Sequence, residues 1–518
     1  MARINSNIPS LVAQEKLNRS QREMGIRLER LSSGLKINRG KDDPAGLIIS
    51  ERIRSNIRGI ENGVKNAERA SAMLSTTEAA LSEVNDLLNS IRGLMVESAN
   101  TGGNSKAERD ANQLQIDSAI ESITRISNTA SFGSLKLLNG SLDYTLSGVR
   151  TSAVSVAQVG NATFVGSTSL QVEVDVTASA QVGALYYNGV NSPAGVTLSA
   201  MTIEIAGPAG VQVLTIASGQ PLAKLVSAVN SVAPLTGVRA DLINNSPASG
   251  MVFKSEDFGA NAFVSVKRLG GPGAVGDSFR LYGAVSDAPP PTGTPFPWSS
   301  LISSGAMATA ERDNGRDVQA IINGNLASGN GLKLKVNSPS LSLDITLTEA
   351  AATRPGAAAS VFHVTGGGSL FQLGPDVIAA QQVGMGIPSV AASRLGATLV
   401  SGSVQYLNAL KSGQAYSIAS NVRSGDFTAA TNILTSAIDQ VTELRGRLGA
   451  FELNVLETTQ RSLSSQYENL TASDSAIRDA DFAYETSRLT RAQILTSAGT
   501  STLQLANQQS QQVLQLLG

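Results

Sequence analysis

The 518-residue chain contains no cysteine and a single histidine, His363. Without cysteine there is no disulfide framework, thiol nucleophile or cysteine-ligated metal, and one histidine cannot supply the paired ligands of an H-E-x-x-H zinc motif. Charged residues make up 16% of the chain, below the roughly 25% of ordinary soluble domains. Such a shortage of catalytic and metal-binding side chains is typical of a structural or assembly protein, so we predict no enzymatic activity, cofactor or metal.

The chain also lacks an excess of charge of either sign and any long apolar run. Its 40 Lys and Arg residues balance 41 Asp and Glu residues, which argues against a nucleic-acid partner. No run of 18 apolar residues occurs, so we expect no membrane insertion. The first 20 residues include Arg3, Lys16 and Arg19 without an apolar core, so we predict no secretory signal peptide.

Proline is nearly absent from both ends of the chain. Pro9 and Pro44 lie near the start, the others fall between Pro193 and Pro388, and residues 389–518 contain none. Proline breaks helices and interrupts central strands. The distribution therefore predicts two helical arms that flank a middle region of a different kind.

The N-terminal arm has an apolar residue at every seventh position. These residues are Ile53, Ile60, Ala67, Leu74, Leu81, Leu88 and Met95. This spacing is typical of the seam of a coiled coil or helical bundle, and residues 53–100 predict a helix of roughly 70 Å. Gly102-Gly103 ends it, and Ser105 with Glu108 has the spacing of a capping box that starts a second helix.

The C-terminal arm shows a matching seam. It comprises Leu434, Val441, Leu448 and Val455, accompanied by Ile438, Leu444 and Phe451. The pattern predicts that the stripe fades at Ser462. Two such seams, about 350 residues apart, most simply pack on each other as antiparallel helices. The alternative is that each seam forms its own homodimeric coiled coil.

The two extreme ends differ from these seams. Residues 1–40 have eight basic and three acidic side chains, whereas residues 492–518 have no charge at all. A helix with a thin apolar stripe is poorly stable alone, but an uncharged face can be buried among copies of itself without unpaired charge. We therefore predict a tail that becomes ordered on assembly; the alternative is a frayed, solvated terminus.

The middle region, residues 146–397, is predicted to be rich in β-strands because apolar and polar residues alternate at several places. Residues 222–229 are expected to form a helix followed by a strand at 238–243. Residues 317–323 repeat this pattern, with a helix followed by a strand at 331–336. The sequence therefore predicts two small α/β units.

Two motif-like segments carry a resemblance to a known family. Residues 31–52 contain Ser-Gly-Leu-Lys-Ile-Asn and Asp-Asp-Pro-Ala-Gly, and residues 477–517 contain Ala506-Asn-Gln508 and Val513-Leu-Gln-Leu-Leu517. Together they closely resemble bacterial flagellin, the filament subunit of the flagellum. The resemblance extends over residues 1–140 and 398–518.

The resemblance implies a multidomain α+β fold with long antiparallel, coiled-coil-like helices from both termini and a β-rich central insertion. Residues 1–44 with 475–518 would form a helical inner-core domain. Residues 45–145 with 398–474 would form a helical rod with a β-hairpin at 132–140. Residues 146–397 would be an outer, variable β-rich region of two subdomains.

The resemblance further assigns filament-assembly contacts to motif residues at both ends. These are Leu31, Leu35, Asp42, Asp43, Arg52, Asp479, Asp481, Arg491, Leu495, Leu503, Ala506, Asn507, Val513 and Leu517. The carboxylate pairs Asp42-Asp43 and Asp479/Asp481 lie beside basic residues. Helix capping or local charge pairing is therefore favoured over acid–base chemistry.

The implied function is polymerisation into the flagellar filament for motility, after type III export to the extracellular space. The implied partners are other copies of the chain, a flagellar export chaperone, the filament cap and the hook–filament junction proteins. Toll-like receptor 5 is a further implied partner. Leu94 keeps an apolar contact of receptor-active relatives, but Ser90 and Gln115 stand where those relatives have Arg and Glu, so we expect weakened binding.

Two other functions fit the sequence. A hook–filament junction adaptor shares the terminal helices, although the uncharged C-terminal ending fits flagellin better. A glycan-binding domain displayed in residues 146–397 is the second alternative. His363, between apolar neighbours, is interpreted as a strand histidine and not as a metal ligand.

Overall fold

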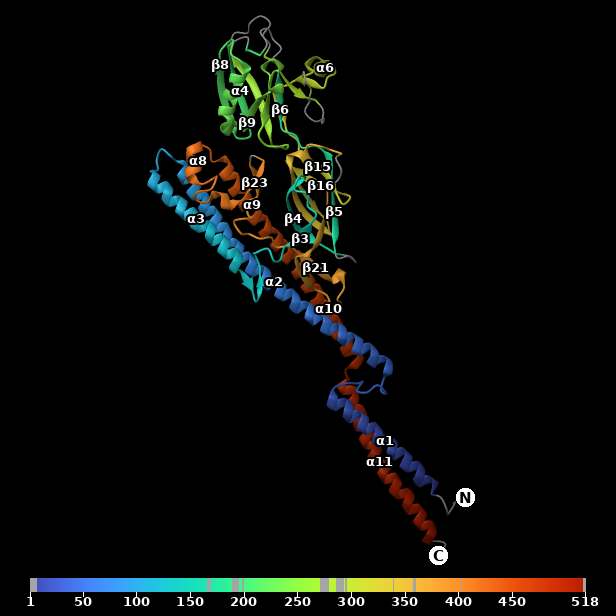
Figure 1. Ribbon diagram of the computed structural model, residues 1–518. Helices are drawn as coiled ribbons and strands as arrows, with labels where there is room; N and C mark the ends of the chain where they lie inside the picture. Colours follow the sequence, from blue (N-terminus) through green and yellow to red (C-terminus); the bar gives the residue numbers. More distant parts are fainter. Residues whose placement is uncertain are drawn as a thin grey trace. The chain divides into compact units, whose positions relative to one another are not determined.

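The computed structural model describes residues 7–164, 169–188, 195–197, 200–270, 279–285, 293, 296–338, 340–356, 360–400 and 402–515. Within them, long helices come from both ends of the chain and strands from the middle (Figure 1). The chain divides into two compact units. Unit 1 comprises Met1–Ala70, Gln372–Gln381 and Leu453–Gly518; unit 2 comprises Ser71–Phe371 and Gln382–Glu452. The prediction of a multidomain α+β fold with helical termini and a β-rich centre is confirmed.

The N-terminal seam lies on one helix, α2 (Pro44–Ala99). From Ile60 to Met95 its seven-residue positions are buried, and Leu81 and Leu88 are fully inaccessible. Helix α3 (Lys106–Thr129) begins with the predicted capping box, in which Ser105 and Glu108 each accept a hydrogen bond from the other's backbone N–H.

Within unit 2, α2 packs against helix α9 (Thr428–Phe451) of the C-terminal arm. Ser71 hydrogen-bonds Glu452, and Glu78 pairs with Arg445 at 3.6 Å. Thr431 approaches the sulfur of Met95. Residue numbers rise along one helix as they fall along the other, so the helices are antiparallel. The two seams therefore share one core, and separate homodimeric coiled coils are not needed to bury them.

The C-terminal seam changes register at a π-helical turn, Glu452–Leu456. Leu434, Val441 and Leu448 are buried, but Val455 is half-buried and Leu456 is buried in its place; of the accompanying positions, Leu444 is buried and Ile438 and Phe451 are half-buried. The seam then resumes in helix α10 (Glu457–Arg478), where Leu463 is buried. A π turn contains one extra residue and moves the seam by one position. Leu463 is the sole buried residue of α10, so the stripe that was predicted to fade at Ser462 fades one residue later.

An eight-stranded antiparallel sheet has the order β3-β19-β5-β15-β16-β17-β18-β4. Its strands are β3 (Tyr144–Ser147), β4 (Val154–Ala162), β5 (Leu170–Ala178), β15 (Gln319–Ile322), β16 (Asn325–Asn330), β17 (Lys333–Asn337), β18 (Leu341–Leu347) and β19 (Ser360–Gly367). Val172, Leu343 and Phe362 lie in its core. The short helix α7 (Glu349–Ala352) follows β18.

The helix predicted at residues 317–323 is wrong, because this segment contains strand β15. Ala320 and Ile322 are both buried while Ile321 is exposed, so the segment follows the two-residue period of a strand. Asn323 and Gly324 then take positive φ angles of 48° and 79° in the turn to β16. A two-residue Asn-Gly turn of this kind closes an antiparallel hairpin.

Two further sheets enclose a separate core. One has the order β13-β12-β6-β10-β9 and the other β14-β11-β7-β8. The strands are β6 (Ala184–Tyr187), β7 (Met201–Gly207), β8 (Gly210–Ile216), β9 (Val238–Leu242), β10 (Met251–Ser255), β11 (Phe263–Gly270), β12 (Leu281–Ala284), β13 (Met307–Thr309) and β14 (Arg312–Asn314). The predicted helix at 222–229 is confirmed as α4 (Leu222–Ser231), which is followed by α5 (Ala233–Thr236); α6 (Trp298–Ser303) lies beside β13.

Short elements join the sheets to the helices. β1 (Ser131–Phe132) and β2 (Leu135–Lys136) form the predicted hairpin after α3. β20 (Ser369–Gln372) pairs with β21 (Gln382–Met385), and β22 (Thr398–Val400) with β23 (Ser403–Gln405). The chain enters and leaves the β region side by side, since Ile387 donates a backbone hydrogen bond to Leu142. Helix α8 (Ile418–Ser424) precedes α9.

The buried seam of α2 yields a stability prediction. Leu88→Ala removes a fully buried side chain and is expected to lower the free energy of unfolding by about 2–5 kcal/mol. Val96→Ala on the same helix is the matched control, because Val96 is 67% exposed and surface truncations stay within about 0.5 kcal/mol. Urea unfolding of the monomer, followed by circular dichroism, measures both; equal losses would contradict the packing described.

Candidate assembly site

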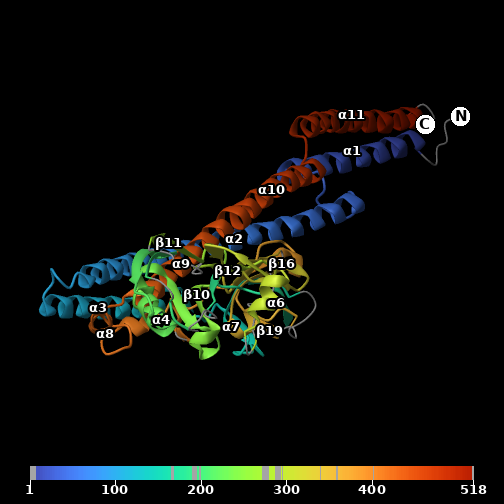
Figure 2. The same cartoon turned by 90° about the horizontal axis from the view of Figure 1, so that it is seen from above.

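The first and last helices of the chain, α1 (Ile8–Ser33) and α11 (Phe482–Gln515), lie side by side in unit 1 (Figures 1 and 2). Their contact buries only small or isolated apolar side chains, among them Ala13, Leu17 and Ala492. A Cβ added at Gly499 would lie 3.3 Å from Leu17 Cδ1, so glycine permits the close approach. A contact between such small side chains buries little apolar surface, so it contributes little hydrophobic stabilisation to the helix pair.

A buried ionic triad joins the two helices where α1 ends and α11 begins. Glu485, only 3% exposed, accepts hydrogen bonds from Arg27 at 2.9 and 3.2 Å and from Arg30 at 3.1 Å. Burial acts to raise the pKa of Glu485, yet the hydrogen bonds and positive charge of Arg27 and Arg30 together hold that pKa below its ordinary value. The carboxylate is therefore ionised and fixed between two guanidinium groups.

Neutral hydrogen bonds join the far ends of the two helices. Asn7 Nδ2 donates to the carbonyl of Ala506 at 3.2 Å, and Ser10 Oγ donates to Asn507 Oδ1 at 2.8 Å. Asn7 also caps α1 by accepting from the backbone of Ser10. The predicted residues Ala506 and Asn507 thus face the start of the chain, and α1 and α11 run antiparallel.

The two motif segments meet where α1 ends. The backbone of Lys36 donates to the carbonyl of Arg478 at 2.7 Å, and the backbone of Ala480 donates to Gly34 at 2.9 Å. Leu35 and Asp479 are therefore partners in an isolated antiparallel bridge. Gly34 itself ends α1 in the left-handed conformation, at φ 73°, which glycine adopts without steric cost.

The paired carboxylates in these motifs accept local hydrogen bonds. Asp42 accepts hydrogen bonds from the backbone N–H groups of Arg39 and Asn38. The bond from Arg39 has the larger effect, and both bonds lower the pKa of Asp42. Asp43 accepts from Gly46 at the start of α2, and Asp481 accepts from two backbone N–H groups at the start of α11. The predicted capping role is confirmed for Asp43 and Asp481.

Next to this junction along the chain, the start of α2 packs against α10. Ser50 is fully buried and donates to Asp474 Oδ1 at 2.6 Å. Glu51 pairs with Arg478 at 3.1 Å. A Cβ added at Gly63 would lie 2.7 Å from the carbonyl oxygen of Leu373 and 3.2 Å from Leu463 Cδ1 of the shifted seam, so glycine permits both contacts. Unit 1 is thus held by a few polar contacts and a narrow seam.

Large apolar side chains stand exposed on the same helices. Ile8, Leu11, Ile48, Phe482, Ile494 and Leu505 are each more than half exposed. Isolated exposed apolar residues are normal on protein surfaces, but these occur along helices that bury little of their own. Large apolar side chains that their own chain leaves uncovered are candidates for contact with another protein chain.

The other predicted assembly residues are dispersed over this surface. Leu31 and Leu503 are half-buried, whereas Arg52, Arg491 and Leu495 are exposed. The side chain of Val513 and the whole of Leu517 lie outside the described residues.

Sequence reasoning missed the Arg27–Arg30–Glu485 triad. A signal for it existed, because Glu485 is the last acidic residue of the chain and residues 1–40 carry an excess of positive charge. The three predicted receptor residues lie on α2 and α3: Ser90 and Gln115 are exposed and Leu94 is half-buried.

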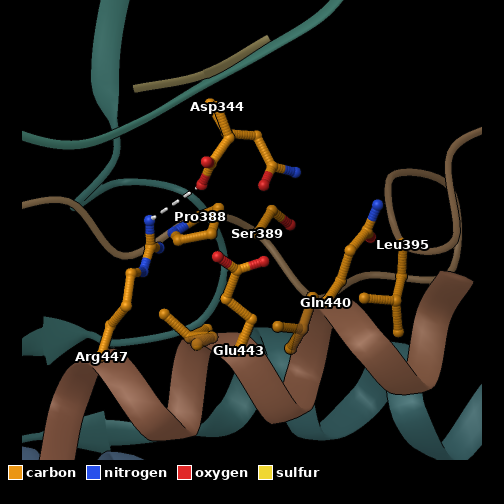
Figure 3. Close-up of a pocket in the computed structure, with 10 residues that line it drawn as sticks. Asp344, Pro388, Ser389, Leu395, Gln440, Glu443 and Arg447 are labelled. Atoms are coloured by element: carbon orange, nitrogen blue, oxygen red, sulfur yellow. Dashed lines mark ion pairs between the residues drawn. The ribbon is translucent and has the colours of Figure 1, made fainter. Parts of the chain in front are cut away.

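A second polar cluster joins the eight-stranded sheet to α9 within unit 2. Glu443 and Arg447 rise from α9 toward Asp344 of β18, with Pro388 and Ser389 beside them (Figure 3). Arg447 lies 4.0 Å and Lys335 3.7 Å from the Asp344 carboxylate, and Lys335 also pairs with Glu443. Burial, and then the negative charge of Glu443, raise the pKa of Asp344. The cluster fixes the sheet on the helix by balanced charges.

Over the part of the chain that the structure describes, no three His, Asp or Glu side chains gather as a metal site requires. None of the described helices has the length and apolarity needed to span a membrane. The pronounced features are instead a helix pair that buries little apolar surface and is held by polar contacts, and the exposed apolar side chains on its helices. Fold and site define the class of proteins whose two ends pair as antiparallel helices around a β-rich middle region.

Family models match both arms. The bacterial flagellin N-terminal helical region matches residues 4–143, and the bacterial flagellin C-terminal helical region matches residues 431–517. A flagellin of Salmonella typhimurium is 30% identical over 553 aligned residues that cover 99% of each chain. The B-type flagellin of Pseudomonas aeruginosa is 29% identical over 99% of each chain. The chain belongs to the bacterial flagellin family.

The chain is accordingly a structural subunit of the flagellar filament. The junction-adaptor alternative is not favoured, because relatives matched over the full length are flagellins. The glycan-binding alternative is likewise not favoured by these matches. The solved flagellar junction protein FlgL from Legionella pneumophila matches 83% of this chain and 100% of its own length, at 14% identity and a TM-score of 0.27.

The buried triad predicts an acid-sensitive helix pair. The pKa of Glu485 is lower in the folded protein than in the unfolded chain. The ionised Glu485 therefore stabilises the helix pair fully above the ordinary glutamate pKa of about 4.3, and this stabilisation is lost as the pH falls through the pKa of Glu485 in the folded protein. Glu485→Gln is expected to cost on the order of 3 kcal/mol at neutral pH and to flatten this acid dependence. Thermal depolymerisation of filaments, followed by light scattering between pH 7 and pH 3, measures both effects.

Glu23→Gln is the matched control, because Glu23 also pairs with Arg27 but is 41% exposed. It should leave the depolymerisation temperature and its pH dependence near those of the unmodified filament. A Glu485→Gln filament with the unmodified acid dependence would contradict the assignment of the triad.

Proposed function

We propose that the chain polymerises through unit 1, with residues 1–44 and 475–518 forming the inner core of the filament. Residues 45–145 and 398–474 form the rod around it, and residues 146–397 face outward. The observation that carries this proposal is the exposed apolar surface on helices whose own pairing buries little. Copies that present the same surfaces make heterologous contacts, and such contacts build an open helical filament.

We also infer that the chain acts without catalysis, as a secreted, extracellular component exported by the type III apparatus of the flagellum. The proposed partners are other copies of the chain, an export chaperone, the filament cap and the hook–filament junction proteins. The family membership and the uncharged C-terminal segment 492–518 support these roles. We propose no nucleic-acid partner, because the numbers of basic and acidic residues are balanced.

Seeded growth tests the assembly surface. Ile494→Lys adds a charge at an exposed position of α11 and is expected to raise the critical concentration at least about tenfold, since a buried unpaired charge costs well over 1.4 kcal/mol. A chain that lacks residues 492–518 should not extend seeds at all. Electron microscopy and sedimentation of polymer measure growth from short filament seeds.

Leu326→Lys is the matched control, because Leu326 is 75% exposed on β16 in the outer region. It should extend seeds like the unmodified chain. Equal growth of the Ile494→Lys and unmodified chains would place assembly elsewhere, provided that both monomers have the same circular dichroism.

A second prediction concerns the receptor surface. We propose weakened binding to Toll-like receptor 5, because exposed Ser90 and Gln115 replace two charged residues of receptor-active relatives. The double variant Ser90→Arg, Gln115→Glu is expected to raise the potency in a reporter-cell assay about threefold to tenfold, because each exposed pair contributes roughly 0.2–1 kcal/mol. Leu94→Ala is the control for loss of signal. An unmodified chain already as potent as active flagellins would refute the proposal.

A further inference from the structure

Charged side chains connect the eight-stranded sheet to α9. Lys335 of β17 and Asp344 of β18 form ion pairs with Glu443 and Arg447 of α9 (Figure 3). A hollow of about 360 Å³ adjoins them, and its polar lining includes Ser328, Asn330, Lys333, Thr346 and Gln440. All of these residues belong to unit 2. A polar joint of this kind opens more easily than an apolar seam, because its opening exposes little apolar surface to water.

The charges of this cluster balance in number but not in distance. Lys335 pairs directly with Glu443, whereas its Nζ lies 3.7 Å from the carboxylate of Asp344. Arg447 approaches Asp344 only to 4.0 Å, and both contacts exceed the roughly 2.7–2.9 Å of a charge-assisted hydrogen bond. Yet Asp344 is the more buried carboxylate, at 27% exposed against 44% for Glu443. Asp344 is therefore the less well compensated of the two.

The positive charge of Arg447 is divided between two carboxyl groups. Gly160 of β4 gives the guanidinium room, because a Cβ there would lie 2.7 Å from Arg447 Nη1. The charge of Arg447 also acts on Asp143, which precedes β3, as does the charge of Arg394. Arg447 Nε is buried and has no hydrogen-bond partner among the described residues. Arg447 thus compensates Asp344 only in part.

The surroundings of Asp344 favour its protonated form. Burial, and then the negative charge of Glu443, raise the pKa of Asp344 against the opposing effects of Lys335 and Arg447. Burial likewise raises the pKa of Asp143. A carboxyl group whose pKa is raised in the docked state stabilises docking fully below the ordinary aspartate pKa of about 3.9. This contribution is lost as the pH rises through the raised pKa.

We infer that this joint is an acid-tightened latch: as the pH falls, Asp344 takes up a proton and the eight-stranded sheet binds α9 more firmly. Neutral Asp344 needs no cation, so Lys335 remains with Glu443, and Arg447 with Asp143. As the pH rises again, the ionised Asp344 competes for the same two cations and the joint loosens. The latch adjusts how firmly the β-rich region is held, and it operates in the single chain, independently of assembly.

Asp344→Asn tests the latch in the full-chain monomer, because it keeps the shape of the side chain and removes its charge. At pH 7 we expect the variant to melt about 2–4 °C above the unmodified chain, since a poorly compensated buried charge is gone while the cations keep Glu443 and Asp143 as partners. This advantage should shrink as the pH falls toward 4. Both chains share every other carboxyl group, so the difference between their melting temperatures isolates Asp344.

Asp241→Asn is the matched control. Asp241 also lies on a strand and pairs with a lysine, Lys254, at 3.3 Å, but its side chain is 62% exposed. Its substitution should leave the melting temperature and its pH dependence near those of the unmodified chain. A second variant, Glu443→Gln, leaves Lys335 available to Asp344. In that background, Asp344→Asn should lose its advantage at pH 7.

Hydrogen exchange establishes whether the change lies at the joint. After correction for the intrinsic effect of pH on exchange, backbone amides of β18 and of residues 440–447 should exchange severalfold more slowly at pH 5 than at pH 7. The Asp344→Asn chain should show no such difference, and amides of β9 should show none in either chain.

The inference would be overturned by an Asp344→Asn chain that melts below the unmodified chain at pH 7. An advantage that stays constant with pH, or exchange at the joint that does not respond to pH, would overturn it equally.

Discussion

The pairing of the two ends of the chain is the constraint on which the other features depend. Only 3% of Glu485 is exposed, and it lies between Arg27 and Arg30, more than 450 residues earlier in the chain. Apolar burial between α1 and α11 is slight, so the charged hydrogen bonds fix which residues face each other. Just beyond the end of α1 and just before the start of α11, the backbone bridge between Leu35 and Asp479 extends the same alignment. Residues at opposite ends of the sequence thereby become one surface.

That alignment determines what the helices leave exposed. Because the polar contacts and small residues take the inner faces, large side chains such as Phe482 and Ile494 remain outside. A single copy of the helix pair therefore leaves large apolar side chains uncovered. In unit 2 the opposite holds, since the seam of α2 is buried to Met95 against its own chain. The two units thus differ in the width of the apolar face that their helices bury: it is narrow between α1 and α11 and wide along α2 in unit 2.

The sequence predicts the helical arms well, because a seven-residue period over many turns has no competing interpretation. It predicts caps such as Ser105 and Asp43 because these act locally. It fails at β15, where seven residues are too few to separate a helical period from a strand period. It fails at Leu456, because nothing before the π turn signals an extra residue. The triad at Glu485 and the pairing of the sheets depend on contacts far apart in the chain, which local pattern does not specify.

The hydrogen bond between Ile387 and Leu142 has a consequence for how such a protein changes over time. The chain leaves the helical part and returns to it at neighbouring points, so the closing geometry is independent of what lies between them. Residues can be added, removed or exchanged in that interval without altering the ends that must fit together. The β-rich region is thus free to diversify in sequence, while the paired helical ends remain under the strict demand of fitting each other.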